Sequence, residues 1–186
     1  MAESDAQSEA ELAEKARPVS DRVQILEIRL LESRAEQKRS DEDLPKRMTQ
    51  TIGVESHLDA KRSQLEVFPH FMLVVKRQAG SPEDLFVRIE ARFALTYAIT
   101  SQENLTEDNY EAFAQRNGVY NAWPYWREFV QSTTVRMGLP PLTLPVYRVG
   151  VSKLHQDTAL PAPKAAKQIG VDREQRTTGS DQKPCD

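Results

Sequence analysis

A period-two alternation over residues 85 to 99 constrains the fold of this chain more than any other feature. The even positions include Arg88, Glu90, Arg92 and Thr96, and the odd positions are all apolar: Leu85, Val87, Ile89, Ala91, Phe93, Leu95, Tyr97 and Ile99. Successive side chains of a β-strand point to opposite faces, so the pattern predicts a strand with one buried face. At about 3.3 Å per residue such a strand spans on the order of 50 Å, which is unusually long. We therefore expect a large sheet face that one chain does not cover alone.

Three further strands are expected before this one. The first contains the apolar cluster Val23, Ile25, Leu26, Ile28, Leu30 and Leu31. Periodicity alone allows a helix or a strand there, and we prefer a strand of about 15 residues. Residues 48 to 58 form a weaker candidate with Gly53 inside, and residues 65 to 75 alternate strongly. Because Pro69 has no N–H donor, the latter strand is expected to be an edge or to be bulged. Residues 41 to 47 are expected to form a crossover loop and 78 to 84 a turn.

Two helices are expected after the strands. Thr106 is a candidate N-cap for a helix from Glu107 to Arg116, with Gly118 just beyond its end. A second helix is expected to begin near Ala122, with Pro124 in its first turn. It ends at Gly138, a candidate C′ residue before two prolines, and its apolar stripe is Trp126, Phe129, Val130, Thr133 and Met137. Strands followed by helices predict an α+β fold.

The two ends of the chain differ in composition from the middle. Residues 1 to 19 are rich in Ala and Glu and have little to bury, so we expect a disordered or partly helical arm. Residues 149 to 186 mix Lys, Gln, Pro, Ala, Asp and Thr without apolar periodicity, and we expect a disordered tail. The domain proper is therefore expected over residues 20 to 148.

Charge and cysteine content narrow the cellular context. The net charge is -3, which argues against nucleic acid as the partner because phosphate binding needs clustered positive charge. A lone cysteine, Cys185, cannot build a disulfide framework and indicates a reducing compartment. Apolar runs fall far short of the roughly 20 residues that cross a bilayer, and the acidic start does not read as a secretory signal. We expect a cytoplasmic protein without membrane insertion.

The sequence contains no recognisable catalytic constellation. His57, His70 and His155 are isolated, without the spacing of metal ligands, and the glycines do not cluster into a phosphate loop. Arg127 and Glu128 are adjacent on a helix, where neighbouring side chains point apart, so a catalytic pair is not expected. We expect no enzyme activity, no cofactor and no metal. The large apolar groups of residues 121 to 148 instead indicate packing and binding.

The helix and the segment after it resemble the SecB family of bacterial export chaperones. That family shows Pro-Tyr-x-Arg-Glu, an apolar helix, Gly, and Pro-x-Leu-x-Leu, which correspond here to Pro124, Tyr125, Arg127, Glu128, Gly138, Pro141, Leu142 and Leu144. The stretch from Val23 to Ile28 also looks like the opening strand of the family. The resemblance covers about residues 20 to 148. The Arg-Leu-Leu ending of that strand and the Pro-Pro-Leu-Thr-Leu run are most similar to the SecB-like branch attached to toxin–antitoxin systems.

Two departures from the export members concern the C-terminal end. A long helix usually follows the Leu-x-Leu segment, whereas residues 151 to 159 allow only a short one before Pro161 and Pro163. The extreme tail of the export members docks on the translocase motor SecA, and residues 178 to 186 do not reproduce that tail. Both departures weaken the link to SecA more than the link to the chaperone fold.

The resemblance implies a four-stranded antiparallel sheet followed by helices, assembled as a homotetramer that is a dimer of dimers. It implies an ATP-independent holdase that binds unfolded or precursor polypeptides and keeps them soluble or export-competent in protein transport, with SecA as a further partner. The alternative is a dedicated chaperone of an aggregation-prone antitoxin. A DNA-binding regulator is disfavoured by the acidic balance.

Two sets of residues follow from this fold. The packing set, expected in the core or between protomers, is Val87, Ile89, Phe93, Tyr125, Trp126, Phe129, Val130 and Met137. The client-binding set, expected to form an apolar groove in which prolines keep the last segment from compact burial, is Leu44, Met48, Phe68, Met72, Phe86, Leu139, Leu142 and Leu144. For any single residue of the client-binding set, packing in the core is preferred over contact with a client.

Overall fold

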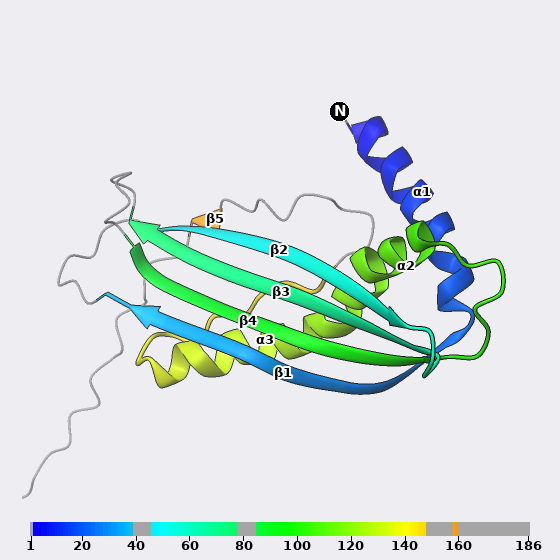
Figure 1. Ribbon diagram of the computed structural model, residues 1–186. Coiled ribbons are helices and arrows are strands. Elements are labelled where there is room, and N and C mark those ends of the chain that lie inside the picture. Colours follow the sequence, from blue (N-terminus) through cyan, green and yellow to red (C-terminus); the bar gives the residue numbers. More distant parts are fainter. Residues whose placement is uncertain (1, 39–45, 78–84, 148–157, 160–186) are drawn as a thin grey trace, which may run out of the picture.

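A long antiparallel sheet organises the chain, as the computed structural model shows for residues 2–38, 46–77, 85–147 and 158–159 (Figure 1). The strand order is β1-β4-β3-β2-β5. The strands are β1 (Val23–Gln37), β2 (Lys46–Asp59), β3 (Gln64–Arg77), β4 (Leu85–Ile99) and the two-residue β5 (Thr158–Ala159), which pairs with β2. Helices lie on one face of this sheet, called here the helix side, and the opposite face is called the far face.

The strands agree with their expected positions. β4 coincides with the alternation over residues 85 to 99, and its odd residues from Val87 to Ile99 are buried on the helix side. β1 has 15 residues, as the apolar cluster predicts. The expected crossover loop lies mostly outside the described residues, since β2 begins at Lys46, and the expected turn over 78 to 84 lies outside them as well.

The position of Pro69 differs from its expected one. β3 pairs with β2 on one side and β4 on the other, so it is not an edge. The register with β2 is unbroken at Val54↔Pro69, and the register with β4 resumes unshifted at His70↔Arg92. The prediction of an edge or a bulge is therefore wrong. A proline removes one ladder donor, and a 14-residue strand keeps its pairing on either side of that loss.

The two expected helices form one continuous path. Helix α2 (Glu107–Phe113) runs through a π-helical segment (Ala114–Gly118) into helix α3 (Val119–Arg136). Gly118 has helical angles, φ −60° and ψ −48°, so it does not end a helix, and Pro124 lies well inside α3. A Cβ on Gly118 would lie 2.5 Å from Val67 Cγ1 of β3. The glycine therefore permits a close approach of helix and sheet, a role that the local pattern does not reveal.

The outer ends of this helical path match their predicted caps. At the start, the Thr106 N–H donates to Asn109 Oδ1 at 2.9 Å. At the end, Gly138 has a positive φ of 74°, where glycine is favoured. The Gly138 N–H donates to the Val135 carbonyl and the Leu139 N–H to the Thr134 carbonyl, both at 3.0 Å, which is the Schellman arrangement.

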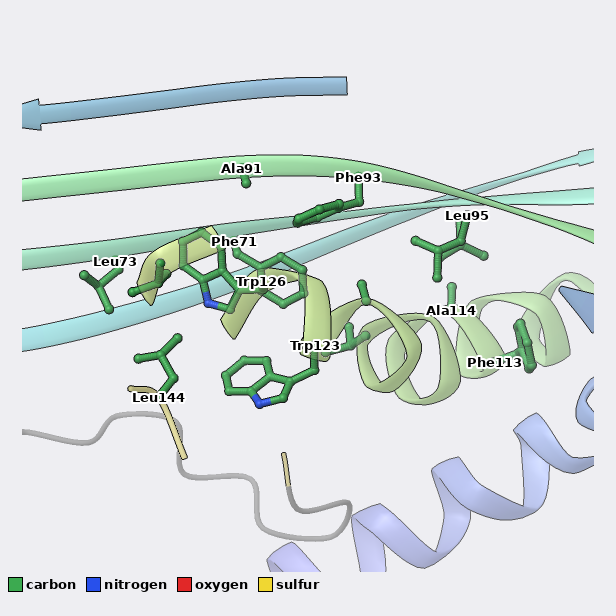
Figure 2. Packing of buried hydrophobic residues seen from close by; sticks show 14 of the residues in the cluster. Phe71, Leu73, Ala91, Phe93, Leu95, Phe113, Ala114, Trp123, Trp126 and Leu144 are labelled. Carbon is green, nitrogen blue, oxygen red and sulfur yellow. The ribbon is translucent and has the colours of Figure 1, made fainter. Parts of the chain in front are cut away.

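Aromatic rings join α3 to the sheet (Figure 2). Phe71 of β3 stacks on Trp126 with ring centroids 5.4 Å apart and planes at 12°. The same ring meets Phe93 and Trp123 edge-on. Beside this cluster, burial raises the pKa of Tyr97 to about 12, so its hydroxyl stays protonated while Asn121 Nδ2 donates to it at 3.0 Å.

The N-terminal arm carries helix α1 (Ala2–Ser20), which packs against α2 at one end of the sheet (Figure 1). Ala16 and Val19 are fully buried there, and Asn109 Nδ2 donates to the Lys15 carbonyl at 2.9 Å. The expectation that this arm has little to bury is wrong at its C-terminal end. Small side chains suffice because they let the two helices approach closely.

The contact of Gly118 gives a stability prediction. Helix propensity alone would make Gly118→Ala stabilising by up to about 1 kcal/mol. We expect the clash with Val67 to dominate and to lower the free energy of unfolding by about 1–3 kcal/mol. Urea-induced unfolding at fixed protein concentration measures this change. The control is Gly53→Ala, where an added Cβ meets no atom within 4 Å. Equal stability of both variants would contradict the assignment.

Candidate functional site

Large apolar side chains remain exposed on one flank of the molecule. On the described residues they belong to the β1 edge, to α3 and to the segment after α3, and they are Ile25, Leu26, Leu30, Leu31, Tyr120, Tyr125, Val135 and Val146. Single exposed apolar residues are common, but four of these, Ile25, Tyr120, Tyr125 and Val146, line one pocket, and such a group marks an interaction surface. Exposed apolar surface, rather than clustered ionisable groups, is thus the chemical feature that distinguishes this flank.

A pocket of about 470 Å³ opens between β1, α3 and the segment after it. It is lined by Ile25, Ile28, Tyr120, Asn121, Trp123, Pro124, Tyr125, Arg127, Val146 and Tyr147. Its aromatic wall includes Tyr147, whose ring centroid lies 5.3 Å from that of Trp123. Burial raises the pKa of Tyr147, and Glu9 adds to the rise while Arg116 opposes it. The phenol therefore stays neutral, which suits an apolar ligand.

The segment of residues 139–147 is extended, and α3 holds it through its backbone. Arg127 Nε donates to the Leu144 carbonyl at 2.8 Å, and Trp123 Nε1 donates to the Pro145 carbonyl at 2.9 Å. The Leu142 N–H donates to Thr134 Oγ1 at 3.1 Å. These bonds satisfy backbone N–H and C=O groups that have no partner in a helix or a sheet. Arg127 is a structural donor in this arrangement.

This anchoring overturns the expectation that the prolines keep Leu144 from compact burial. Leu144 is 1% exposed and belongs to the core, beside Leu73 and the two tryptophans in Figure 2. Met48 is also a core residue, at 7% exposure. By contrast, Leu139 and Leu142 are half-buried against the core and still present accessible surface. Leu44 lies outside the described residues.

The sheet separates the predicted client-binding set into two groups. Phe68 and Met72 occupy even positions of β3 and lie on the far face. The others belong to the core on the helix side or pack against it: Met48, Phe86, Leu139, Leu142 and Leu144. The single groove expected from all these residues is therefore not formed within the described chain. The Phe68 ring lies under the Arg92 guanidinium, 5.4 Å from its centroid.

Charged pairs cover much of the far face. Arg92 Nη2 lies 2.8 Å from Glu55 Oε2, and Arg88 pairs with Glu90 on the same strand. On β1 the pairs are Arg29 with Glu27 at 3.2 Å and Arg34 with Glu36 at 2.8 Å. A face covered in this way is well suited to solvent, so the far face is the weaker candidate for apolar recognition.

The packing set lies mostly on the helix side. Val87, Ile89, Phe93, Trp126 and Val130 are buried, and Phe129 and Met137 are half-buried against them. Tyr125 is 49% exposed, so it does not belong to the core of the single chain. Trp123, which the set omits, is 2% exposed. Its spacing of three residues from Trp126 was the signal that could have identified it.

Among the described residues, no group of three His, Cys, Asp or Glu side chains comes together as metal ligands. No helix in the described part of the chain is long and apolar enough to cross a membrane.

Comparison with solved structures finds a SecB-like chaperone. The SecB-like chaperone Rv1957 of Mycobacterium tuberculosis, solved in complex with a ChAD peptide from the Rv1956 HigA1 antitoxin, superposes with a TM-score of 0.61 at 28% identity. The match covers 74% of this chain and 99% of the mycobacterial chain. It confirms the resemblance to SecB-like chaperones and the fold of a four-stranded antiparallel sheet followed by helices.

Other comparisons add little. A Streptococcus agalactiae protein of unknown function aligns over 66% of this chain and 96% of its own at 11% identity, with a TM-score of 0.36, which is too low to indicate a common fold. The sequence matches no protein-family model, and no curated protein matches it.

The burial of Leu144 gives a second stability prediction. We expect Leu144→Ala to lower the free energy of unfolding by about 2–5 kcal/mol, because it leaves a cavity beneath α3. Leu139→Ala removes the same atoms from a half-buried site and should cost less than half as much. Denaturant unfolding of both variants at one protein concentration measures the difference. Equal losses would mean that the segment is not held against the core as described.

Proposed function

We propose that this SecB-like chain is an ATP-independent chaperone dedicated to an aggregation-prone antitoxin. The observation that carries the proposal is the structural match to a mycobacterial SecB-like chaperone that was solved with an antitoxin peptide. The exposed apolar side chains of β1, α3 and the segment after α3 are consistent with binding of an apolar partner. A general export role, with SecA as partner, was the first expectation from the sequence and has no comparable support.

The client is proposed to bind along residues 139–146 on the helix side. The backbone of this segment is fixed by Arg127, Trp123 and Thr134, so it presents Leu139 and Leu142 without a large loss of chain entropy. Apolar contacts of this kind suit an extended client because they do not require a fixed sequence. Phe68 and Met72, on the charged far face, are assigned no client contact.

Assembly into a dimer of dimers is part of the proposal. The outer side of α3 exposes Tyr120, Tyr125 and Val135 while its inner side packs on the sheet. These apolar side chains stand among polar ones such as Glu128 and Gln131, and a second layer would remove them from water. A second sheet on that outer side would supply the missing layer.

The location of the client site gives a prediction with a matched control. Leu139→Ser/Leu142→Ser should weaken binding of the HigA1 ChAD peptide and of a chemically unfolded model protein about 10-fold or more, because two apolar contacts are lost. Phe68→Ser/Met72→Ser makes a similar change on the far face and should leave both affinities within about twofold. Fluorescence anisotropy measures binding, and circular dichroism confirms folding. The reverse ranking would place the client on the far face.

The function itself is tested by aggregation and size together. The purified full chain should suppress aggregation of an unfolded model protein and should sediment as a species larger than a dimer. Affinity capture from the organism that expresses the chain should recover one dominant antitoxin, encoded by a neighbouring gene. Recovery of many unfolded precursors together with SecA would favour the export role. Failure to suppress aggregation, in a chain shown to be folded, would refute the chaperone proposal.

A further inference from the structure

A short strand from the C-terminal part of the chain occupies one end of the outer edge of β2. β5 pairs with it antiparallel, with Ala159 opposite Arg47 and Thr158 opposite Met48. Figure 1 shows β5 beside the start of β2. β2 has 14 residues, and on its outer side the stretch Thr49–Asp59 has no strand partner among the described residues. The cover is therefore much shorter than the edge.

A cover of two residues does not protect this edge from other chains. A strand edge presents a row of backbone N–H and C=O groups that any extended chain can satisfy. On the helix side the edge is lined mostly by apolar side chains, and Ile52, Val54 and Leu58 are only partly buried there. The β2 edge thus remains available to an extended apolar chain.

The occupied end of β2 lies next to the segment that is proposed to hold the client. Gln50 of β2 is the ladder partner of Leu73, and Leu73 lies beside Leu144 on the helix side (Figure 2). Leu144 belongs to the segment whose backbone α3 holds. A client on this segment therefore lies near the end of β2 that β5 occupies.

Gln50 provides a second observation at the same place. Its side chain is 7% exposed and lies on the helix side, two residues along the strand from Met48. Its Nε2 has no hydrogen-bond partner among the described residues. A buried donor without a partner is unfavourable, and a carbonyl oxygen of an arriving chain would satisfy it. This end of β2 is therefore suited to an extended chain that brings hydrogen-bond acceptors.

We infer that β5 is an intramolecular competitor of the client. It occupies the start of the β2 edge in the free chain, and the client displaces it by pairing with β2 over a longer stretch. The inference rests on the proposed function and adds a regulation of the same site. Both chains use backbone hydrogen bonds, which do not depend on sequence, so one can replace the other.

The tether to the domain explains how so short a strand can compete. Ten residues, 148 to 157, separate Tyr147 from Thr158. A short linker holds a binding segment at an effective concentration on the order of 1 mM, so a pairing too weak between separate molecules is populated within one chain. Pro161 has no N–H to donate, which limits how far β5 can extend in that direction. A client that pairs over more residues therefore prevails.

Two proline substitutions in the full chain test the competition. Thr158→Pro/Ala159→Pro removes both backbone donors of β5. It should tighten binding of the HigA1 ChAD peptide about 3- to 10-fold, because a larger fraction of the chains then has a free edge. The control Ala165→Pro/Ala166→Pro introduces the same residues farther along the sequence and should leave the affinity within about twofold. Fluorescence anisotropy measures the affinity, and circular dichroism confirms folding.

A disulfide that holds β5 on β2 tests the opposite case, in a background of Cys185→Ser. Arg47→Cys/Ala159→Cys joins two residues that face each other across the strands, a separation that a disulfide can span. Arg47 is exposed, so its replacement leaves the core intact. Oxidation should weaken binding of the peptide about 10-fold or more, and reduction with dithiothreitol should restore it. The reduced form of the same variant is the matched control.

The outcomes separate this inference from the chaperone proposal. The inference alone is overturned if the wild-type chain, the β5 proline variant and the oxidised cysteine variant bind the peptide with equal affinity. It is also overturned if the β5 proline variant binds more weakly, which would make β5 a support of the client site. Absence of binding in all of these forms would refute the chaperone proposal together with this inference.

Discussion

The stacked contact between Phe71 and Trp126 fixes the element on which the proposed site is built. It holds α3 across the sheet, with Trp123 edge-on to the same phenyl ring. Because α3 is fixed, the donors Arg127 and Trp123 are fixed as well, and they hold the carbonyl groups of Leu144 and Pro145. The accessible Leu139 and Leu142 are therefore positioned by aromatic packing on the other side of the helix.

The single chain leaves apolar surface uncovered at the β1 edge and on the outer side of α3. The helices cover only the helix side of the sheet, and β1 retains an open edge with exposed leucines. The outer side of α3 also exposes Tyr120, Tyr125 and Val135, among polar side chains. Both surfaces are continuous with the pocket, to which Ile25, Ile28 and Tyr125 contribute. One protomer thus provides half of two interfaces, consistent with the proposed assembly.

Features that depend on local chain chemistry were predictable from the sequence. The alternation over residues 85 to 99 identified β4 and its buried face, and Gly138 identified the end of α3. The Pro-Tyr-x-Arg-Glu motif pointed to the correct fold. Local periodicity predicts which face of a strand or helix a side chain occupies, and this is sufficient for regular elements such as β4 and α3.

Features that depend on contacts between distant segments were not predictable. Gly118 was assigned to a helix end, and this was wrong. Its role is a close contact with Val67, which is far away in the sequence and therefore invisible to a local pattern. Leu144 was expected to be accessible, but it is buried. The side chains that hold its segment come from α3, and the sequence of the segment itself does not reveal them. Tyr125 was assigned to packing, yet it is exposed in the single chain. The motif that contains it does not indicate which residues it contacts.

The alternation already places Phe68 and Met72 opposite the apolar odd face. Which face the helices and the segment after them cover depends on contacts between distant segments, and that placement separates Leu139 and Leu142 from Phe68 and Met72.

Methyl NMR of the full chain, titrated with an unfolded antitoxin peptide, locates the client on the chain. We expect intermolecular contacts and shift changes at the methyl groups of Leu139, Leu142 and Val146, with Met72 unaffected. Contacts confined to Met72 and its neighbours on the far face, or no contacts at saturating peptide, would contradict it.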